Sequence, residues 1–332
     1  MTKHANISIF VAHVGCPNMC SFCNQHTISG CKDIPTADKV SQICKEALSA
    51  VASPENTQIA FFGGSFTAIE REYMISLLKA AREYVGEGKF SGIRISTRPD
   101  AIDDEVLRIL KSYGVTAIEL GAQSMSDEVL SANDRGHTAE DVIKASELIK
   151  SYGFELGLQM MTGLYKSSES LDIRTAQEII KLRPDTVRIY PTVILEGTRL
   201  SELYKSGEYK TMEFDEMVKL CAKLLLMFHK ENISVIRCGL HASDNVEGER
   251  VGGFYHPAFK ELCESAVYRD IIEQSIPSDY KGKLTAVVSP AAVSKAMGHK
   301  KSNHQYFKAK GIDMSVKQDK QMGMYQCRVI RG

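Results

Sequence analysis

Three closely spaced cysteines near the N-terminus are the residues of this sequence best suited to chemistry. Cys16, Cys20 and Cys23 form a C-x3-C-x2-C run that places three thiols within eight residues. Such a loop can wrap one metal centre, and iron–sulfur clusters are held by cysteine thiolates, usually four of them. Three ligands leave one iron open to a substrate or cofactor. The pattern favours an iron–sulfur cluster, and the alternative is a structural zinc site completed by His13 or His26.

Further polar and glycine-bearing motifs follow the ends of strand-like segments. Gly63, Gly64 and Ser65 come directly after one such segment, and paired glycines let the backbone approach a ligand closely. The other motifs are Ser96-Thr-Arg-Pro-Asp100, Gly121-Ala-Gln-Ser124, Asp134-Arg-Gly-His137, Gln159-Met-Met-Thr-Gly163 and Tyr190-Pro191-Thr192. In parallel α/β folds, ligands collect at the carboxyl ends of the strands. We therefore expect these motifs and the cysteine run to surround one site.

The elements that must position these motifs alternate regularly along the chain. Strand-like segments are predicted at 7–14, 57–62, 92–96, 116–121, 154–161 and 186–190. Helix-like segments follow them at 40–51, 71–85, 103–113, 138–152, 168–182 and 213–231, and Thr67 and Glu70 predict a capping box before the second of these. Six strand–helix units predict an α/β fold with a parallel sheet. The pattern alone fits an open sheet, a partial barrel or a complete barrel.

Beyond a short strand candidate at 234–237 the alternation weakens, which predicts a second unit. We expect residues 1–240 to form the main domain and residues 241–332 a small α+β extension. A helix is predicted at 257–274, strands at 284–289 and 326–330, and a helix at 291–297.

The net charge of zero is a cancellation between these two parts. The 41 Lys and Arg residues balance 41 Asp and Glu, but from Lys281 onward eleven basic residues face only two acids. The last segment therefore carries +9 and the preceding 280 residues carry −9. Its basic residues are interleaved with Tyr306, Phe307 and Tyr325, which suits phosphate neutralisation and base stacking. This predicts an RNA partner for residues 281–332, and the alternative is a solvated face docked on the acidic body.

Composition places the chain among globular proteins of the cytoplasm. It has 332 residues with 43% hydrophobic and 25% charged residues, and no apolar run long enough for a membrane helix. The N-terminal residues lack the pattern of a secretion signal, so the nine cysteines suggest metal or redox chemistry and not disulfides. Outside the loop, Cys238 and His241 are candidates for the mouth of a barrel. The spacing of Cys263 and Cys327 offers no pair for a second metal site.

With Phe22 before its last cysteine, the C-x3-C-x2-C run resembles that of the radical S-adenosylmethionine (SAM) superfamily. The resemblance covers roughly residues 7 to 240 and is strongest to the radical SAM domain of the Elongator catalytic subunit. It implies a partial (β/α)6 TIM-type barrel. It also implies a [4Fe–4S] cluster on Cys16, Cys20 and Cys23, whose open iron takes the methionine amino and carboxylate groups of SAM.

The resemblance further implies which residues bind SAM. Gly63, Gly64 and Ser65 stand in the glycine-rich turn that hydrogen-bonds the SAM amino group. Gln123 and Arg135 match a SAM-binding Gln and Arg of the family, with Arg135 expected near the carboxylate.

Two positions depart from the family pattern. Ser96 stands where many relatives carry a ribose-binding Glu, and Gln159 replaces an Asp of the oxygen-independent coproporphyrinogen oxidases. Both replacements keep the capacity for hydrogen bonds but lose charge.

The activity implied is that of a radical SAM enzyme. A reduced cluster passes one electron to SAM, and the resulting 5′-deoxyadenosyl radical removes hydrogen from an unreactive C–H bond. The electron would come from a donor such as flavodoxin or ferredoxin. Because the nearest relatives act on tRNA, the expected substrate is RNA, and tRNA in particular. No acetyl-CoA loop is recognisable, so acetyl transfer is not implied.

Two alternatives remain open from the sequence. One is a radical SAM enzyme acting on a small molecule, such as a tetrapyrrole or metabolite. The other is a non-enzymatic RNA-binding protein with a structural zinc site.

Overall fold

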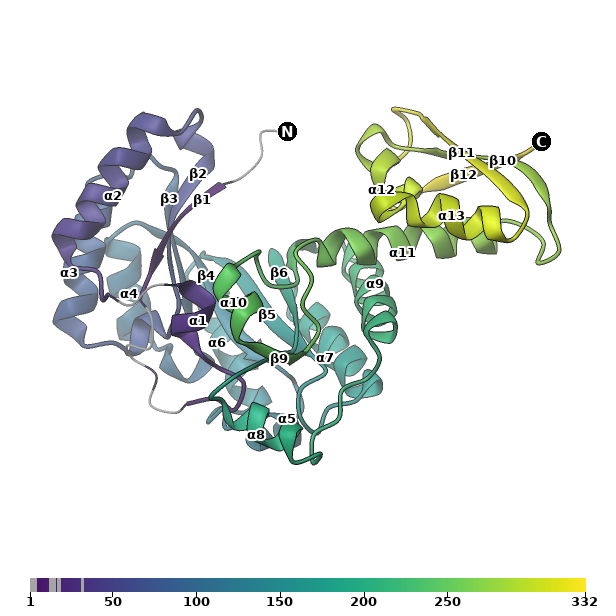
Figure 1. Cartoon of the computed structure of the whole chain (residues 1–332). Helices are drawn as coiled ribbons and strands as arrows, with labels where there is room; N and C mark the ends of the chain where they lie inside the picture. Colours follow the sequence, from purple (N-terminus) through teal and green to yellow (C-terminus); the bar gives the residue numbers. More distant parts are fainter. Residues whose placement is uncertain (1–4, 12–15, 17–18, 31–32) are drawn as a thin grey trace.

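The computed structural model describes residues 5–11, 16, 19–30 and 33–332, and in this part of the chain seven parallel strands form one curled sheet (Figure 1). The strands are β1 (Ala5–Phe10), β2 (Thr57–Phe62), β3 (Gly92–Thr97), β4 (Val115–Gln123), β5 (Glu155–Thr162), β6 (Thr186–Pro191) and β8 (Ser234–Cys238). They pair in the order β1-β2-β3-β4-β5-β6-β8. The predicted partial barrel is confirmed, and the weak strand candidate before residue 240 is its last strand.

Helices cover the outer face of this sheet (Figure 1). They are α2 (Ala37–Ala50), α3 (Arg71–Arg82), α4 (Asp104–Ser112), α6 (Ala139–Ser151), α7 (Glu169–Lys181) and α9 (Phe214–Lys230). In α4, Val106, Leu107 and Leu110 recur at helical spacing and are all buried against the sheet. None of the helices in the described part of the chain is long and apolar enough to cross a membrane.

The start of α3 differs from the prediction. Thr67 lies in the short 3-10 turn η2 (Phe66–Ala68), and no capping box with Glu70 forms. Glu70 is itself the N-cap, because its carboxylate accepts hydrogen bonds from the backbone N–H groups of Glu72 and Tyr73. The prediction of a Thr67 capping box is therefore wrong. Further 3-10 turns are η1 (Pro54–Asn56), η3 (Pro99–Ala101) and η4 (Pro290–Ala292).

Short elements close around the carboxyl ends of the strands. They are α1 (Gln25–Ser29), α5 (Asp127–Ala132), α8 (Arg199–Lys205), α10 (Asp244–Glu249) and the antiparallel pair β7 (Val193–Leu195) and β9 (Arg250–Gly253). The pair requires glycine at Gly253, where φ is +81° and a Cβ would meet the Thr192 carbonyl oxygen at 2.4 Å. Through β9 and α10, residues beyond 240 pack at the mouth of the barrel.

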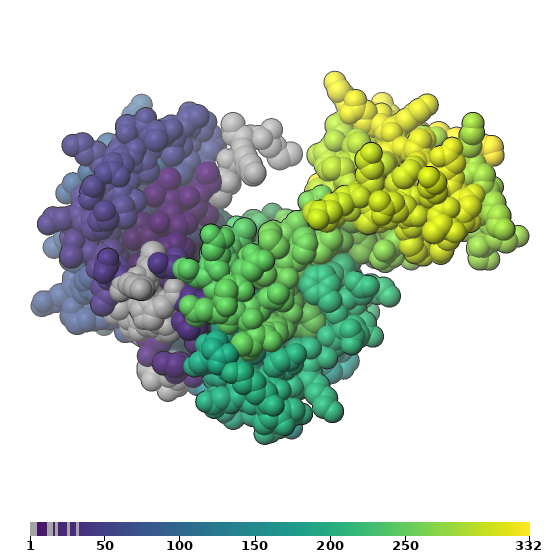
Figure 2. All heavy atoms as spheres, in the orientation of Figure 1, coloured from purple at the N-terminus to yellow at the C-terminus, as the bar shows by residue number. Residues whose placement is uncertain are grey.

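A small α+β module follows the barrel, as expected. It consists of β10 (Gly282–Val288), α12 (Val293–Met297), η5 (His299–Lys301), α13 (Ser302–Ala309), β11 (Ile312–Gln318) and β12 (Cys327–Arg331). Strand β10 pairs parallel with β11 and antiparallel with β12. The long helix α11 (Phe259–Gln274) joins this module to the barrel, and the module stands apart from the N-terminal half of the barrel (Figures 1 and 2).

Candidate active site

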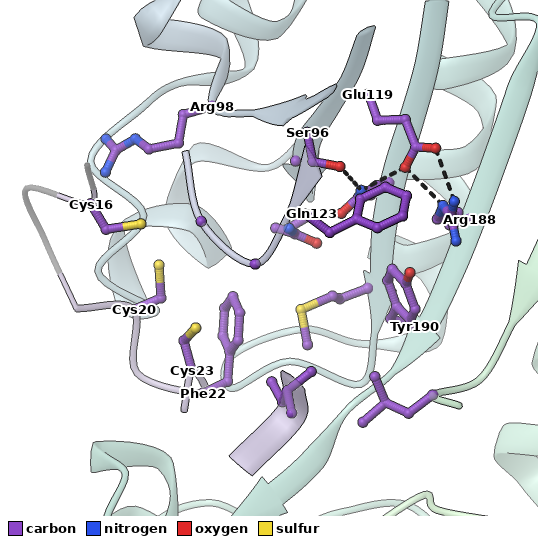
Figure 3. Close-up of a pocket in the computed structure, with 18 of the residues that line it drawn as sticks. Cys16, Cys20, Phe22, Cys23, Ser96, Arg98, Glu119, Gln123, Arg188 and Tyr190 are labelled. Carbon is purple, nitrogen blue, oxygen red and sulfur yellow. Dashed lines mark hydrogen bonds and ion pairs between the residues drawn. The ribbon is translucent and has the colours of Figure 1, made fainter. Parts of the chain in front are cut away.

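A cavity of about 470 Å³ lies at the carboxyl ends of the parallel strands (Figure 3). Its volume falls in the range typical of small-molecule and cofactor sites. Nine of the ten residues predicted for the site line it. These are Cys16, Cys20, Cys23, Gly63, Gly64, Ser96, Gln123, Arg135 and Gln159. The tenth, Ser65, is buried directly behind the wall.

The three loop cysteines lie together at one end of this cavity (Figure 3). The backbone N–H of Cys23 donates to the Cys20 carbonyl over 3.0 Å, which turns the loop so that both side chains face the cavity. Arg135 Nη1 donates to Cys20 Sγ over 3.1 Å, which places a positive charge beside the thiols. His13 lies outside the described residues and the side chain of His26 is not described, so the zinc alternative stays untested.

Hydrogen bonds from neighbouring elements fix this loop in place. Ser21, between Cys20 and Cys23, donates through its hydroxyl to Asn133 Oδ1 over 2.8 Å, and its carbonyl accepts from the Leu200 N–H over 2.8 Å. The loop is thereby tied to the segment between α5 and α6 and to the start of α8.

The glycine-rich turn after β2 is held by Ser65. Its hydroxyl hydrogen-bonds Thr97 Oγ1 over 3.0 Å and accepts from the Arg98 N–H over 3.2 Å. Gly63 has φ of +97°, a conformation that favours glycine. Ser65 therefore positions the turn that forms the wall and does not itself line the cavity.

Gln123 and Arg135 meet at the end of β4. Gln123 has φ of +64° at a register shift of β4, which turns its side chain along the cavity wall. Gly121 makes room for both residues, because a Cβ there would lie 3.0 Å from Gln123 Nε2 and 3.3 Å from Arg135 Nη2. Gln123 Oε1 and Arg135 Nε are buried without hydrogen-bond partners among the described residues. Such atoms are costly unless a ligand satisfies them.

A buried carboxylate, Glu119, anchors the opposite end of the cavity (Figure 3). It is 1% exposed and accepts from Arg188 Nε and Nη2 over 2.8 and 2.9 Å and from Arg94 Nη1 over 3.2 Å. Gln159 Nε2 donates to Glu119 over 2.9 Å and to Ser96 Oγ over 3.4 Å. Ser96 and Gln159, predicted from different strands, thus meet directly, and a residue that the sequence analysis did not select holds Gln159 in place.

The sequence does contain a signal for Glu119. It is the lone charged residue of β4, and Arg94 and Arg188 are lone cations in β3 and β6. Because an unpaired buried charge is costly, isolated opposite charges on nearby strands predict an internal ion pair.

The two candidates at and just after the end of β8, Cys238 and His241, point to different places. His241 lines the cavity together with Arg237, and burial followed by the charge of Arg237 lowers the pKa of His241. Cys238 is buried and is not among the lining residues. Of this pair, only His241 faces the mouth of the barrel.

His137 is a buried histidine close to the site. Its Nε2 lies 3.2 Å from the Ala122 carbonyl, and Nδ1 has no partner among the described residues. Burial, with the charge of Arg135 as the next cause, lowers the pKa of His137 to about 4 from an ordinary value of 6.5. The imidazole is therefore neutral at neutral pH.

The low pKa of His137 predicts acid sensitivity. As the pH falls below 6.5, His137 takes up a proton in the unfolded chain, whereas in the folded protein it stays neutral down to about pH 4. The free energy of unfolding therefore decreases as the pH falls from 6.5 to 4. The loss amounts to roughly 3 kcal/mol. We expect the free energy of unfolding of His137→Gln, measured by urea denaturation, to depend much less on pH between 6.5 and 4. A variant of the exposed His229, His229→Gln, should keep the pH dependence, and an unchanged pH dependence in His137→Gln would contradict the assignment.

Comparison with protein families identifies the architecture over most of the chain. The family model of the radical SAM superfamily matches residues 11–178, and that of the radical SAM C-terminal domain matches residues 184–269.

Among curated proteins, tRNA uridine(34) acetyltransferase of Methanocaldococcus jannaschii is 31% identical over 196 residues, which cover 53% of this chain and 36% of that protein. Human Elongator complex protein 3 is 31% identical over 195 residues, with the same two shares. The chain thus spans only about a third of the length of these relatives.

Among solved structures, the archaeal Elp3 of Methanocaldococcus infernus superposes with a TM-score of 0.62 at 22% identity, covering 82% of this chain and 63% of that one. Coproporphyrinogen III oxidase of Escherichia coli gives a TM-score of 0.50 at 18% identity, with coverages of 69% and 52%. At these identities the similarity supports the fold.

Proposed function

The chain belongs to the radical SAM superfamily of enzymes, and from this premise we propose that its cavity binds a [4Fe–4S] cluster and SAM side by side. The observation that carries the proposal is the donor set of this one cavity. Three thiols lie at one end, and unpartnered buried polar atoms of Gln123 and Arg135 lie beside them. Thiols are the ligands of such clusters, and unpartnered polar atoms suit a polar cofactor.

In this proposal Cys16, Cys20 and Cys23 hold the cluster. When bound, the cluster supplies one electron for reductive cleavage of the SAM sulfonium, which generates a radical able to remove hydrogen from unreactive C–H bonds. A flavodoxin or ferredoxin would deliver the electron. We place the enzyme in the cytoplasm, where reductants keep such thiols free.

The other predicted residues orient SAM. The Gly63–Gly64 backbone takes the methionine amino group, and Arg135, beside Cys20, takes the carboxylate. Ser96 and Gln159 offer neutral hydrogen bonds to the ribose, with Glu119 holding Gln159 in place. Apolar lining residues exclude water from the reacting centre. These are Phe22, Met161, Val193 and Leu195.

We further propose that the substrate is RNA, and tRNA in particular. Support comes from the tRNA uridine(34) acetyltransferase relatives and from the basic module. We treat residues 1–240 as the catalytic barrel and residues 241–332 as the extension, with the basic module from residue 281 contacting phosphates. The substrate atom would enter the cavity beside Arg237 and His241.

The basic residues of the module divide into two sets. One set is already neutralised, since Lys295 pairs with Glu264, Lys310 with Glu273 and Arg328 with Asp319. The other is exposed and has no acidic partner among the described residues. It comprises Lys281, Lys283, Lys300, Lys301, Lys308, Lys317, Lys320 and Arg331. The docked-face alternative therefore accounts for only part of the charge.

The aromatic side chains of this segment were expected to stack on bases, but in the structure they pack against other residues of the protein. Phe307 is fully buried in the core of the module, and Tyr325 packs against Tyr268 and His229. Tyr306 is half-buried against Phe307 and contacts Lys310. The module is therefore suited to phosphate contacts by lysine, without an aromatic platform for bases.

The decisive test is anaerobic reconstitution with iron and sulfide, followed by incubation with SAM, dithionite and bulk tRNA. Nucleoside mass spectrometry should then reveal a new modified nucleoside, and 5′-deoxyadenosine should form. If 5′-deoxyadenosine forms while every nucleoside stays unchanged, the substrate is a small molecule. If neither product forms in a protein that contains the cluster, the proposal fails as a whole.

The two lysines at the α12–α13 turn give a sharper test of RNA binding. Lys300→Glu with Lys301→Glu should weaken tRNA binding roughly tenfold at moderate salt. The slope of the logarithm of the binding constant against the logarithm of the salt concentration should become smaller in magnitude by about two. Lys45→Glu with Lys79→Glu, an equal charge change on α2 and α3, should leave both quantities nearly unchanged. Filter binding over a range of salt concentrations measures this, and equal losses in both double variants would contradict a specific role of the module.

A further inference from the structure

Three buried cysteines from separate parts of the chain meet away from the cavity. Cys221 lies on α9, Cys238 ends β8 and Cys263 lies on α11, and their three Sγ atoms are all within 4.8 Å of one another. None is more than 5% exposed, and none lines the cavity. From the sequence, no second metal site was expected, because the spacing of Cys263 and Cys327 along the chain offers no pair. The fold instead gives Cys263 two other neighbours.

We propose that Cys221, Cys238 and Cys263 form a second metal site that binds one thiophilic closed-shell ion, Zn²⁺ or Cu⁺. Thiolate ligands select these ions among the common biological metals. Zinc–sulfur bonds of about 2.3 Å in tetrahedral geometry place the sulfurs about 3.8 Å apart. The cluster would thus have to contract by at most about 1 Å, which side-chain adjustment can supply.

The surroundings of Cys221 add soft and polar donors. Met217 Sδ lies 3.7 Å from Cys221 Sγ, one helical turn away on α9. Thr162 Oγ1, at the end of β5, lies 3.1 Å from Met217 Sδ and 3.8 Å from Cys221 Sγ. A thioether suits the same soft ions as the thiolates do. Met217 is therefore the fourth donor that the structure offers.

The protonation pattern suits a cation at this position. Hydrogen bonds from the thiols of Cys221 and Cys263 lower the pKa of Cys238, and the charge of Lys260 contributes further, whereas burial raises the pKa of Cys221 and of Cys263. Lys260 Nζ is held nearby by a 2.7 Å hydrogen bond to the Val235 carbonyl. An incoming ion would displace the thiol protons. The excess negative charge of three thiolates would then face Lys260.

Such a site would fasten the extension to the barrel. Its ligands come from the last barrel strand, from a barrel helix and from α11, which joins the barrel to the basic module. The bound ion would therefore add a further link that holds α11 in its packed direction on the barrel.

Metal analysis can test this if the loop cysteines are first removed, because they would bind metal themselves. The full chain with Cys16→Ala, Cys20→Ala and Cys23→Ala, purified from medium supplemented with zinc or copper, should retain about one ion per chain. Mass spectrometric metal analysis should show that adding Cys238→Ser removes the ion. Adding Cys44→Ser, which changes a buried cysteine on α2 outside the cluster, should keep it.

A second measurement covers the case in which Cys238→Ser fails to fold. In the variant lacking only the loop cysteines, a chelator should lower the melting temperature by roughly 5 °C, and zinc or copper(I) should restore it. Metal content below a tenth of an ion per chain, with no thermal shift on adding either ion, would overturn the proposal. Because no step depends on the iron–sulfur cluster, the result is independent of the proposed radical chemistry.

Discussion

Replacing Cys20 by alanine is expected to abolish both the brown colour of the reconstituted protein and the formation of 5′-deoxyadenosine from SAM. Cys20 is the central cysteine of the run and receives the hydrogen bond of Arg135. Its loss leaves two thiols, and a cluster that needs at least three protein ligands would not be retained. Iron and sulfide analysis, absorption spectra and chromatography of the nucleoside product measure the effect.

A matched control separates ligation from packing. Cys44 is fully buried on α2, belongs to neither cysteine cluster and only fills the core. Cys44→Ala should keep the iron, the sulfide and the product at the level of the unaltered chain. Continued formation of 5′-deoxyadenosine by the Cys20→Ala protein would refute the assignment of the loop as the cluster site.

The second large effect concerns stability. Glu119→Gln should lower the free energy of unfolding by about 3–5 kcal/mol, because it leaves the guanidinium groups of Arg94 and Arg188 with too little negative charge in a buried site. Arg94 keeps its ion pair with Glu155, so the loss falls mainly on Arg188. Urea denaturation followed by circular dichroism gives the value.

An exposed ion pair provides the control for this substitution. Glu140 pairs with Lys144 on α6, and both side chains are more than half exposed. Glu140→Gln should therefore change stability by no more than about 0.5 kcal/mol. A Glu119→Gln effect as small as that would mean that water reaches this end of the cavity and solvates the charges of the two arginines.

Sequence patterns predicted the strands, the helices and their parallel pairing because they reflect local physics, whereas the family resemblance supplied the choice of a partial barrel. Each strand such as β2 is a short apolar run, each helix such as α4 has an apolar stripe, and parallel pairing follows from their alternation. The placement of Cys16, Gly63 and Gln123 around one cavity follows from the same rule, since strand ends share an edge. The assignment of a separate role to each of them came from the family resemblance, and the unpartnered polar atoms of Gln123 and Arg135 came from the structure.

What the sequence did not predict depends on contacts between distant segments. Glu119 acquires its importance from Arg94 and Arg188, which lie 25 and 69 residues away. The meeting of Cys221, Cys238 and Cys263 depends on how α11 packs on α9 and β8. In the module, α13 and β11 are polar on their exposed sides, and their fully buried apolar residues are Phe307, Ile312 and Met314.

Helix α11 has a consequence for the cooperativity of unfolding. It contributes Ala266 and Val267 to the core of the barrel, and it contributes Tyr268 and Ile272 to the cores of the module, where both are fully buried. One rigid helix is thus shared by two hydrophobic cores, so neither can melt without uncovering apolar surface on the other. Barrel and module are therefore expected to unfold as a single cooperative unit. Removing the residues from 281 onward would expose Tyr268 and Ile272 to solvent. Charge-changing substitutions of surface lysines on the module leave both cores intact.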